Sequence, residues 1–116
     1  MKYAVMVYET AQDFAQRNNE EAPAYWAAYS AYGAALREAG VAAGGQALQG
    51  PSTATTLRIE GGKRHVQDGP YAETKEQLGG FFLIEVPDLD AALEWAARCP
   101  AATRGAVEVR PILPMQ

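Results

Sequence analysis

The order of the strand-like and helical patterns along this chain constrains its fold more than any other feature. Apolar or alternating stretches typical of strands are interrupted twice by stretches with the 3.6-residue period of a helix. In chain order the pattern is strand, helix, strand, hairpin strand, strand, helix, strand: Lys2–Tyr8, Asn19–Gly40, Ala54–Glu60, Lys63–Gln67, Phe81–Val86, Asp88–Cys99 and Gly105–Ile112. Two strand–helix–strand halves around one antiparallel sheet predict an α+β fold of the ferredoxin-like, split βαβ type.

Such a sheet carries helices on one face only, and its other face must also be covered. The strand Phe81–Val86 is apolar on both faces, so both of its faces are expected to be buried. A chain of 116 residues is long enough for one domain and too short for two, so we expect a single domain over residues 1–116. The sequence therefore predicts a homodimer that is formed through the sheet faces.

The composition excludes several classes of function. The hydrophobic fraction of 48% supports a globular core, and a net charge of −4 without a basic stripe argues against nucleic-acid binding. No apolar stretch approaches the length of a membrane span, and no signal peptide is recognisable. The single cysteine, Cys99, allows no internal disulfide and is interpreted as a small buried apolar residue. These features predict a cytoplasmic protein with no membrane contact.

The first helical pattern has an aromatic face. Tyr25, Tyr29, Tyr32 and Leu36 are spaced so that they share one side of the helix, which is expected to begin near a cap at Asn19. Core packing is the favoured interpretation of this face. Lining of a pocket is the alternative, because a phenol in a fully apolar core must still find a hydrogen-bond partner.

The segment Asp68–Gly80, with the sequence DGPYAETKEQLGG, is the strongest motif in the chain. It combines a turn, a polar loop and two glycines before a buried strand, which is typical of the rim of a small pocket. We predict Asp68 as a catalytic proton acceptor, with capping of the turn as the alternative. Three further charged residues, Glu73, Lys75 and Glu76, are candidates for binding a small polar or anionic ligand, and the alternative is a loop held by its own ion pair.

Together with the helix end Leu36–Val41 and the segments Thr53–Thr56, Asp88–Ala96 and Val107–Pro111, this motif resembles the YCII-related, or DGPF, domain family. The resemblance implies a dimeric ferredoxin-like fold, also called a dimeric α/β barrel. The family is similar to muconolactone isomerases and related small enzymes. Members of its DGPF branch are often encoded beside, or fused to, extracytoplasmic-function sigma factors.

The resemblance also bears on individual residues. It makes Tyr8, at the end of the first strand, and Gln46 ligand-binding candidates. Many family members carry Glu where this chain has Gln46, and an amide can only donate and accept hydrogen bonds. The YciI-like branch is associated with a His–Asp pair, but the only histidine here, His65, lies in the hairpin strand. We interpret His65 as a surface residue.

Two functions of different classes fit these observations. The first is a small enzyme without a cofactor, an isomerase or lyase that moves a proton on a small polar or anionic organic molecule. The second is a non-catalytic ligand-binding or interaction module in stress signalling. The spacing of His, Cys and acidic residues predicts no metal site, and no glycine-rich motif predicts dinucleotide binding. An enzyme requires a closed cavity with a perturbed titratable group, whereas an interaction module requires an exposed apolar patch beyond the dimer contact.

Overall fold

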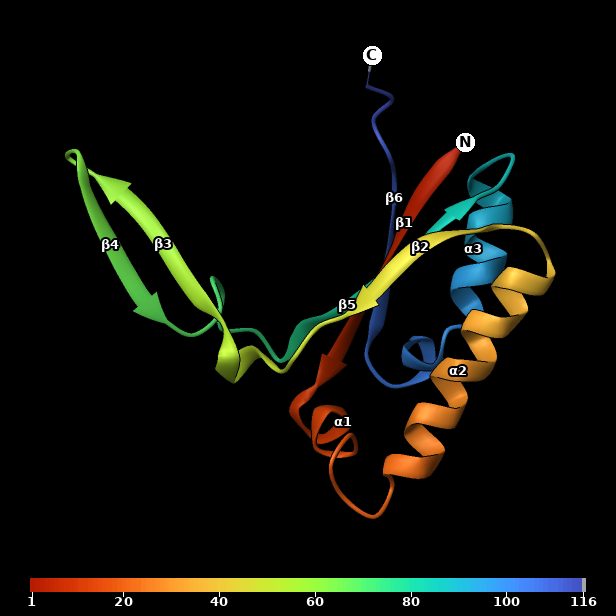
Figure 1. Cartoon of the computed structure of the whole chain (residues 1–116), viewed down its shortest axis with the longest axis horizontal. Helices are drawn as coiled ribbons and strands as arrows, with labels where there is room; N and C mark the ends of the chain where they lie inside the picture. The colour runs from red at the N-terminus through yellow and green to blue at the C-terminus, as the bar shows by residue number, and fades with distance from the viewer. Residues whose placement is uncertain (116) are drawn as a thin grey trace.

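The computed structural model describes residues 1–115 as an α+β fold with helices against one face of an antiparallel sheet (Figure 1). The elements in chain order are β1 (Lys2–Thr10), α1 (Ala11–Ala15), α2 (Ala22–Glu38), β2 (Ala42–Ala47), β3 (Thr55–Glu60), β4 (Lys63–Asp68), β5 (Glu76–Glu85), α3 (Leu89–Ala97) and β6 (Ala106–Pro111), with two 3₁₀ turns, η1 (Pro51–Thr53) and η2 (Pro100–Thr103). The main sheet has the strand order β2-β5-β1-β6, and β3 and β4 form a second sheet. The ferredoxin-like prediction is confirmed.

The first strand is central, as expected from the run Lys2–Tyr8, which is apolar on both faces. Strand β1 pairs antiparallel with β5 on one side and with β6 on the other. Its odd-numbered residues from Tyr3 to Glu9 are buried, whereas the even-numbered ones are half-buried. This alternation of period two directs the odd-numbered side chains toward the helices. The last strand, β6, lies at the edge of the sheet, as expected of a strand that contains Pro111, which cannot donate to a neighbouring strand.

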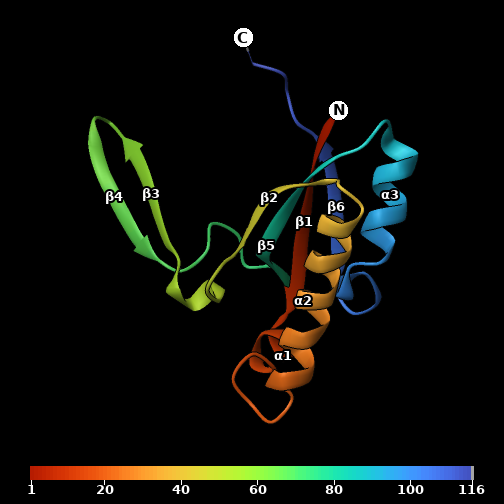
Figure 2. The same ribbon diagram turned by 45° about the vertical axis from the view of Figure 1, so that its right-hand side comes forward.

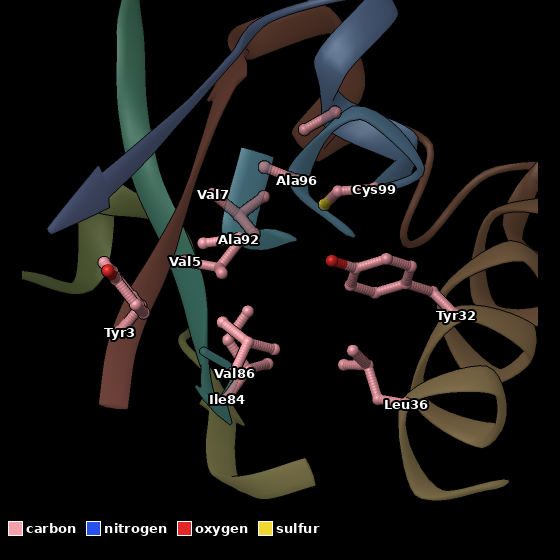
Figure 3. Packing of buried hydrophobic residues seen from close by; sticks show 11 residues of the cluster. Tyr3, Val5, Val7, Tyr32, Leu36, Ile84, Val86, Ala92, Ala96 and Cys99 are labelled. Carbon is pink, nitrogen blue, oxygen red and sulfur yellow. The ribbon is translucent and has the colours of Figure 1, made fainter. Parts of the chain in front are cut away.

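The core lies between the sheet and the two long helices (Figure 3). Val5 and Ile84 from the two central strands are fully buried, and Leu36 of α2 and Ala92 of α3 pack against the same cluster. Cys99 belongs to this cluster with an exposed fraction of 2%, which confirms its interpretation as a buried apolar residue.

The helix boundaries follow the capping signals in part. Asp88 caps α3 by accepting a hydrogen bond from the Ala91 amide at 2.9 Å, a position at which aspartate is favoured. Gly40 follows the end of α2 with a φ of 74°, a conformation that suits glycine. The predicted cap at Asn19 is wrong, since α2 begins after Glu21. Asn19 instead accepts a hydrogen bond from the Glu21 amide in the turn that precedes the helix.

The prediction for the strand that lies beside β5 is wrong. The sequence predicts residues 54–60 as a strand of the main sheet, but the glycine-rich strand β2 occupies the position beside β5. A Cβ on Gly45 would lie 2.6 Å from the Phe81 carbonyl oxygen, so glycine is what allows β2 to approach β5. The positive φ of Gly45, 148°, has the same requirement. The glycines of β2 therefore mark its close contact with β5.

The hairpin β3–β4 projects away from the rest of the molecule (Figures 1 and 2). Within residues 1–115 the two strands pair with each other and with no other strand. The radius of gyration is 15.9 Å, whereas a compact domain of this length has about 13 Å. Among residues 1–115, no helix is long and apolar enough to cross a membrane.

Candidate functional site

A cavity of about 570 Å³ lies between helix α2 and the β2–β5 side of the main sheet. Aromatic and aliphatic side chains, four glycines of the sheet and three charged side chains line it. The lining consists of Val7 and Glu9 of β1, Arg17, the α2 residues Tyr25, Trp26, Tyr29, Ser30, Gly33, Leu36 and Arg37, the β2 residues Ala42, Gly44, Gly45, Gln46 and Ala47, and the β5 residues Gly79, Gly80, Phe81 and Phe82. Its volume is that of a small-molecule site.

Glu9 is a buried carboxylate at the end of β1. The alternation of the strand directs it toward the helices, and its exposed fraction is 3%. The Tyr25 hydroxyl lies 2.8 and 2.7 Å from the two carboxylate oxygens, and the Tyr29 hydroxyl donates to Oε2 at 3.2 Å. Arg17 donates from Nη2 to Oε1 at 3.1 Å. A cation together with several hydrogen-bond donors offsets the cost of burying a carboxylate away from water.

Arg17 connects this carboxylate to three other parts of the chain. Its guanidinium donates to the Gly79 carbonyl at 3.0 Å, to the Leu48 carbonyl, and to the Tyr25 hydroxyl at 2.9 Å. The guanidinium carbon also lies 4.8 Å from the centre of the Phe14 ring. The five donors of a planar guanidinium make such a multiple contact possible, and a lysine has only three. Arg17 therefore fixes the geometry of the cavity at the Glu9 end.

The short helix α1 brings Arg17 to this position. Thr10 accepts a hydrogen bond from the Asp13 amide at 3.2 Å, and the Asp13 carboxylate accepts one from the Thr10 amide at 3.4 Å. This reciprocal pair is a capping box, which stabilises the start of a helix. The chain thus turns sharply after Glu9 and returns Arg17 to the same carboxylate.

The two phenols beside Glu9 are held in their protonated form. Burial raises the pKa of Tyr25 well above its usual value, and the hydrogen bond to Glu9 raises it further. Burial also raises the pKa of Tyr29, with the negative charge of Glu9 as the next cause. Both hydroxyls are therefore donors throughout the neutral pH range.

The glycines that end the Asp68–Gly80 motif shape this site. Gly79 lies where the register between β1 and β5 shifts, and a Cβ at this position would be 2.7 Å from Glu9 Oε1 and 3.0 Å from Arg17 Nη2. A Cβ on Gly80 would be 2.8 Å from the Gln46 carbonyl oxygen. Any side chain at either position would displace the charged pair or the neighbouring strand.

The cavity carries an excess of positive charge. Its lining has Arg17 and Arg37 against the single carboxylate of Glu9, which leaves one positive charge in a chain whose net charge is −4. Arg37 is in no ion pair among residues 1–115. Its Nη1 atom would lie 3.3 Å from a Cβ on Gly33, one turn earlier in α2. A glycine in mid-helix thus makes room for the guanidinium beside the cavity.

The sequence comparisons identify the family. The sequence model of the YCII-related domain matches residues 1–116. This chain belongs to the YCII-related domain family. It is also 39% identical over 114 residues to an uncharacterised protein of Rhizobium meliloti (strain 1021), a match that covers 97% of this chain and 92% of the relative. The predicted family resemblance is confirmed.

In this YCII-related domain the predicted acid–base residue lies outside the cavity. Asp68 is exposed at the end of β4, in the projecting hairpin, and is absent from the lining. Its carboxylate accepts no hydrogen bond within residues 1–115, so the alternative of a turn cap is wrong. The turn is held instead by the Gly69 amide, which donates to the Ala54 carbonyl at 2.8 Å, and by the Thr56 hydroxyl, which donates to the Gly69 carbonyl at 2.9 Å.

The charged residues of the loop are likewise away from the cavity. Glu73 and Lys75 are exposed, Glu76 is half-buried, and all three lie outside the lining. None of them forms an ion pair in the part of the chain that the structure describes, so the alternative of a loop held by its own ion pair is wrong. The Gln77 side-chain amide holds the loop by donating to the Ala72 carbonyl at 2.8 Å and the Thr74 carbonyl at 3.2 Å.

The two candidates that came from the family resemblance lie on or beside the other face of the sheet. Tyr8 alternates with Val7 and Glu9, and its hydroxyl donates to Glu108 Oε1 at 3.2 Å on β6. Gln46 contributes to the cavity lining, but it pairs in register with Phe81 and so shares the face opposite the helices. The structure thus separates Tyr8 from the cavity and leaves Gln46 at its edge.

His65 is exposed on β4, opposite Arg58, which confirms its interpretation as a surface residue.

The aromatic face of α2 serves both predicted roles. Tyr32 is buried in the core and donates to the Trp95 carbonyl at 2.8 Å, whereas Tyr25 and Tyr29 line the cavity.

Sequence reasoning missed Glu9 and Arg17. One signal was available for Glu9, because it continues the buried positions Tyr3, Val5 and Val7 at the same spacing of two. A charged residue in that register had to be buried with partners. Arg17 gave no comparable signal, since it lies in a polar stretch between two helices.

Proposed function

We propose that this YCII-related domain binds a small anionic organic molecule in the Glu9 cavity and moves a proton on it without a cofactor, as an isomerase or lyase does. The observation that carries the proposal is a buried carboxylate beside two protonated phenols, in a cavity whose charged lining is net positive. Proton transfer requires a base and a donor within reach of one bound molecule.

The residues take distinct roles in this proposal. Arg37 pairs with the anionic group of the ligand, since it is in no ion pair within residues 1–115. Glu9 accepts the proton from carbon, and the Tyr29 hydroxyl donates a hydrogen bond to the oxygen on which negative charge develops. Trp26 and Phe82 provide the apolar wall against which the carbon skeleton packs.

Binding is tested by NMR titration with benzoate and with its neutral counterpart benzamide. Benzoate is expected to shift the amide signals of Gly45, Gly79 and Gly80, and benzamide is expected to bind at least about tenfold more weakly, because it cannot pair with a guanidinium. Arg37→Gln should remove this preference, while Arg58→Gln on the hairpin should preserve it. Equal affinity for both probes would overturn the anionic-ligand proposal.

Proton transfer is tested by following hydrogen–deuterium exchange of β,γ-unsaturated carboxylic acids in D₂O by NMR. Exchange that depends on the wild-type protein, falls at least about a hundredfold in Glu9→Gln and persists in Asp68→Asn supports the Glu9 assignment. The reverse result supports Asp68, which stays a prediction of the sequence. Thermal melts establish beforehand that each variant is folded.

The second candidate function is ligand binding or protein interaction without turnover. One observation favours it, namely the exposed apolar side chains of the hairpin β3–β4. Saturable binding of benzoate without exchange of any acid in the panel would favour this candidate.

We also propose that the domain is a homodimer through the face of the main sheet that no helix of residues 1–115 covers. Met6, Phe81 and Leu83 lie on that face and are half-buried, in register across β1 and β5. Light scattering is expected to give twice the chain mass at micromolar concentration. Leu83→Glu should yield a monomer, because a charge in a sheet interface is left without water or a partner. A wild-type monomer would overturn this proposal.

A further inference from the structure

The hairpin β3–β4 exposes one apolar face that no other part of residues 1–115 covers. Leu57, Ile59 and Val66 have exposed fractions of 51%, 61% and 59%. The register pairs Leu57 with Val66, and Ile59 lies two residues further along β3 on the same face. The opposite face carries Arg58 and His65, so the hairpin is amphipathic with its apolar side in solvent.

A two-stranded hairpin of this kind has little stability by itself. Two strands alone are marginally stable in water, and a third strand or a packing partner is normally required. The hairpin forms its own two-stranded sheet and projects from the body (Figure 2). The apolar face of this projecting hairpin therefore requires another surface to pack against.

The charges on this face indicate what that surface is. Arg64 pairs in register with Ile59 toward the tip of the hairpin, and Asp68 pairs with Thr55 toward its base. Leu57 and Val66 lie at the centre between them. Neither Arg64 nor Asp68 is in an ion pair within the described part of the chain.

This arrangement is complementary to itself. Two such hairpins can face each other across a two-fold axis that lies midway between them, opposite the Leu57–Val66 pair and perpendicular to the strands. This axis places the tip of each hairpin opposite the base of the other. Arg64 of each copy then faces Asp68 of its partner, and Val66 faces Val66. Two-fold contacts are built from one patch that matches its own copy.

We propose that the apolar face of β3–β4 packs against the same face of a second copy of this chain, with two Arg64–Asp68 ion pairs at its ends. Three aliphatic side chains from each copy make a contact at the small end of protein interfaces. The hairpin pairing is therefore proposed in addition to the larger contact between the sheet faces, and it does not replace that contact. Asp68 takes a binding role in it that is separate from any chemistry.

The first test is cross-linking of Val66→Cys with a short bismaleimide, with His65→Cys as the matched control. Facing sheets lie about 10 Å apart, which such a linker spans. The native Cys99 is 2% exposed and is common to both variants. Covalent dimers from Val66→Cys but not from His65→Cys support the proposal. Equal yields from the two variants, or no dimer from either, would overturn it.

The second test reverses charges in the Val66→Cys background. Arg64→Asp and Asp68→Arg, made singly, are each expected to lower the cross-linked yield about tenfold, because like charges then face each other. The double variant should restore the yield, since it exchanges the two charges and leaves the ion pairs intact. Arg58→Asp, on the other face, should have no effect. Failure of the double variant to recover would exclude the two-fold pairing, whatever the oligomeric state.

Discussion

Gly79 lies so close to Glu9 that a Cβ at position 79 would be 2.7 Å from the carboxylate oxygen Oε1. This relationship connects the most conspicuous motif of the sequence to a residue that lies seventy positions earlier in the numbering. It explains why a pair of buried glycines lies within β5. The second glycine keeps β2 close, while the first leaves space for the Glu9–Arg17 pair.

Gly79→Ala is therefore expected to destabilise the protein by about 1–3 kcal/mol, the usual range for an overpacked interior. The added methyl group meets the Glu9 carboxylate and the Arg17 guanidinium, which cannot both move without losing hydrogen bonds. Urea unfolding measures the effect. The control is Gly50→Ala, because Gly50 has a φ of −61° and a Cβ there would meet nothing within 4 Å. Similar effects of the two substitutions would contradict the close-contact argument.

Loss of Arg17 should be among the most damaging single changes in the chain. Arg17→Met is expected to lower the free energy of unfolding by roughly 3 kcal/mol, because it leaves the Glu9 carboxylate buried without its counter-charge. Adding Glu9→Gln to Arg17→Met should cost less than Glu9→Gln alone. The measurement is a double-mutant cycle by urea unfolding.

The surface pair Arg110–Glu108 provides the comparison for that cycle. Its Nε–Oε2 distance is 3.0 Å, close to that of the buried pair, but its side chains are 71% and 41% exposed. Arg110→Met is expected to change stability by no more than about 0.5 kcal/mol. Independent, additive effects of Arg17→Met and Glu9→Gln would show that the buried pair is not coupled.

The buried tyrosines predict a loss of stability at high pH. Burial raises the pKa of Tyr25, Tyr29 and Tyr32 above the ordinary value of 10.0, so the folded state keeps protons that the unfolded state releases. Their contribution to stability is therefore complete below pH 10 and is lost as the pH rises above it. The expected slope is about 1.4 kcal/mol per pH unit for each protected phenol.

Urea unfolding between pH 9 and about pH 11 checks this slope. Tyr32→Phe removes one protected phenol without touching the cavity and should make the slope shallower. Tyr71, which is 77% exposed, is the control, and Tyr71→Phe should leave the slope unchanged because it removes no buried phenol. A slope that is the same in the wild type and in Tyr32→Phe would contradict the assignment.

The sequence predicts the general fold well because its signals are local. The apolar character of β1 and the cap at Asp88 are readable from neighbouring residues, and so is the end of α2 at Gly40. The strand β2 was missed for the opposite reason. Its glycines meet the backbone of β5 from nearly forty residues away, and composition alone presents them as a break.

The site was predicted less well, for a related reason. The sequence predicts Asp68 from a conspicuous turn, yet Asp68 lies at the end of the projecting hairpin, outside the cavity. Glu9 and Arg17 meet across a sharp reversal of the chain, and Gly79 joins them through the β1–β5 pairing. Local sequence motifs do not contain that pairing.

His65→Ala is expected to change the free energy of unfolding by no more than about 0.5 kcal/mol, since the side chain is exposed and lies on the polar face of the hairpin. It should also leave benzoate binding and any proton exchange within a few-fold of the wild type. Denaturation and the NMR assays described above measure both. A hundredfold loss of exchange, with a bell-shaped pH profile near neutrality, would instead place His65 in the chemistry.

Gly33→Ala separates stability from binding. A glycine in mid-helix is less favourable than alanine by about 1 kcal/mol, so this substitution alone should stabilise α2. The new Cβ would lie 3.3 Å from Arg37 Nη1, which is the far end of a flexible side chain and can move away. We therefore expect a protein that unfolds at higher urea concentration but binds benzoate more weakly, because Arg37 has left the cavity. A loss of stability with unchanged benzoate affinity would show that Gly33 serves packing and not the Arg37 position.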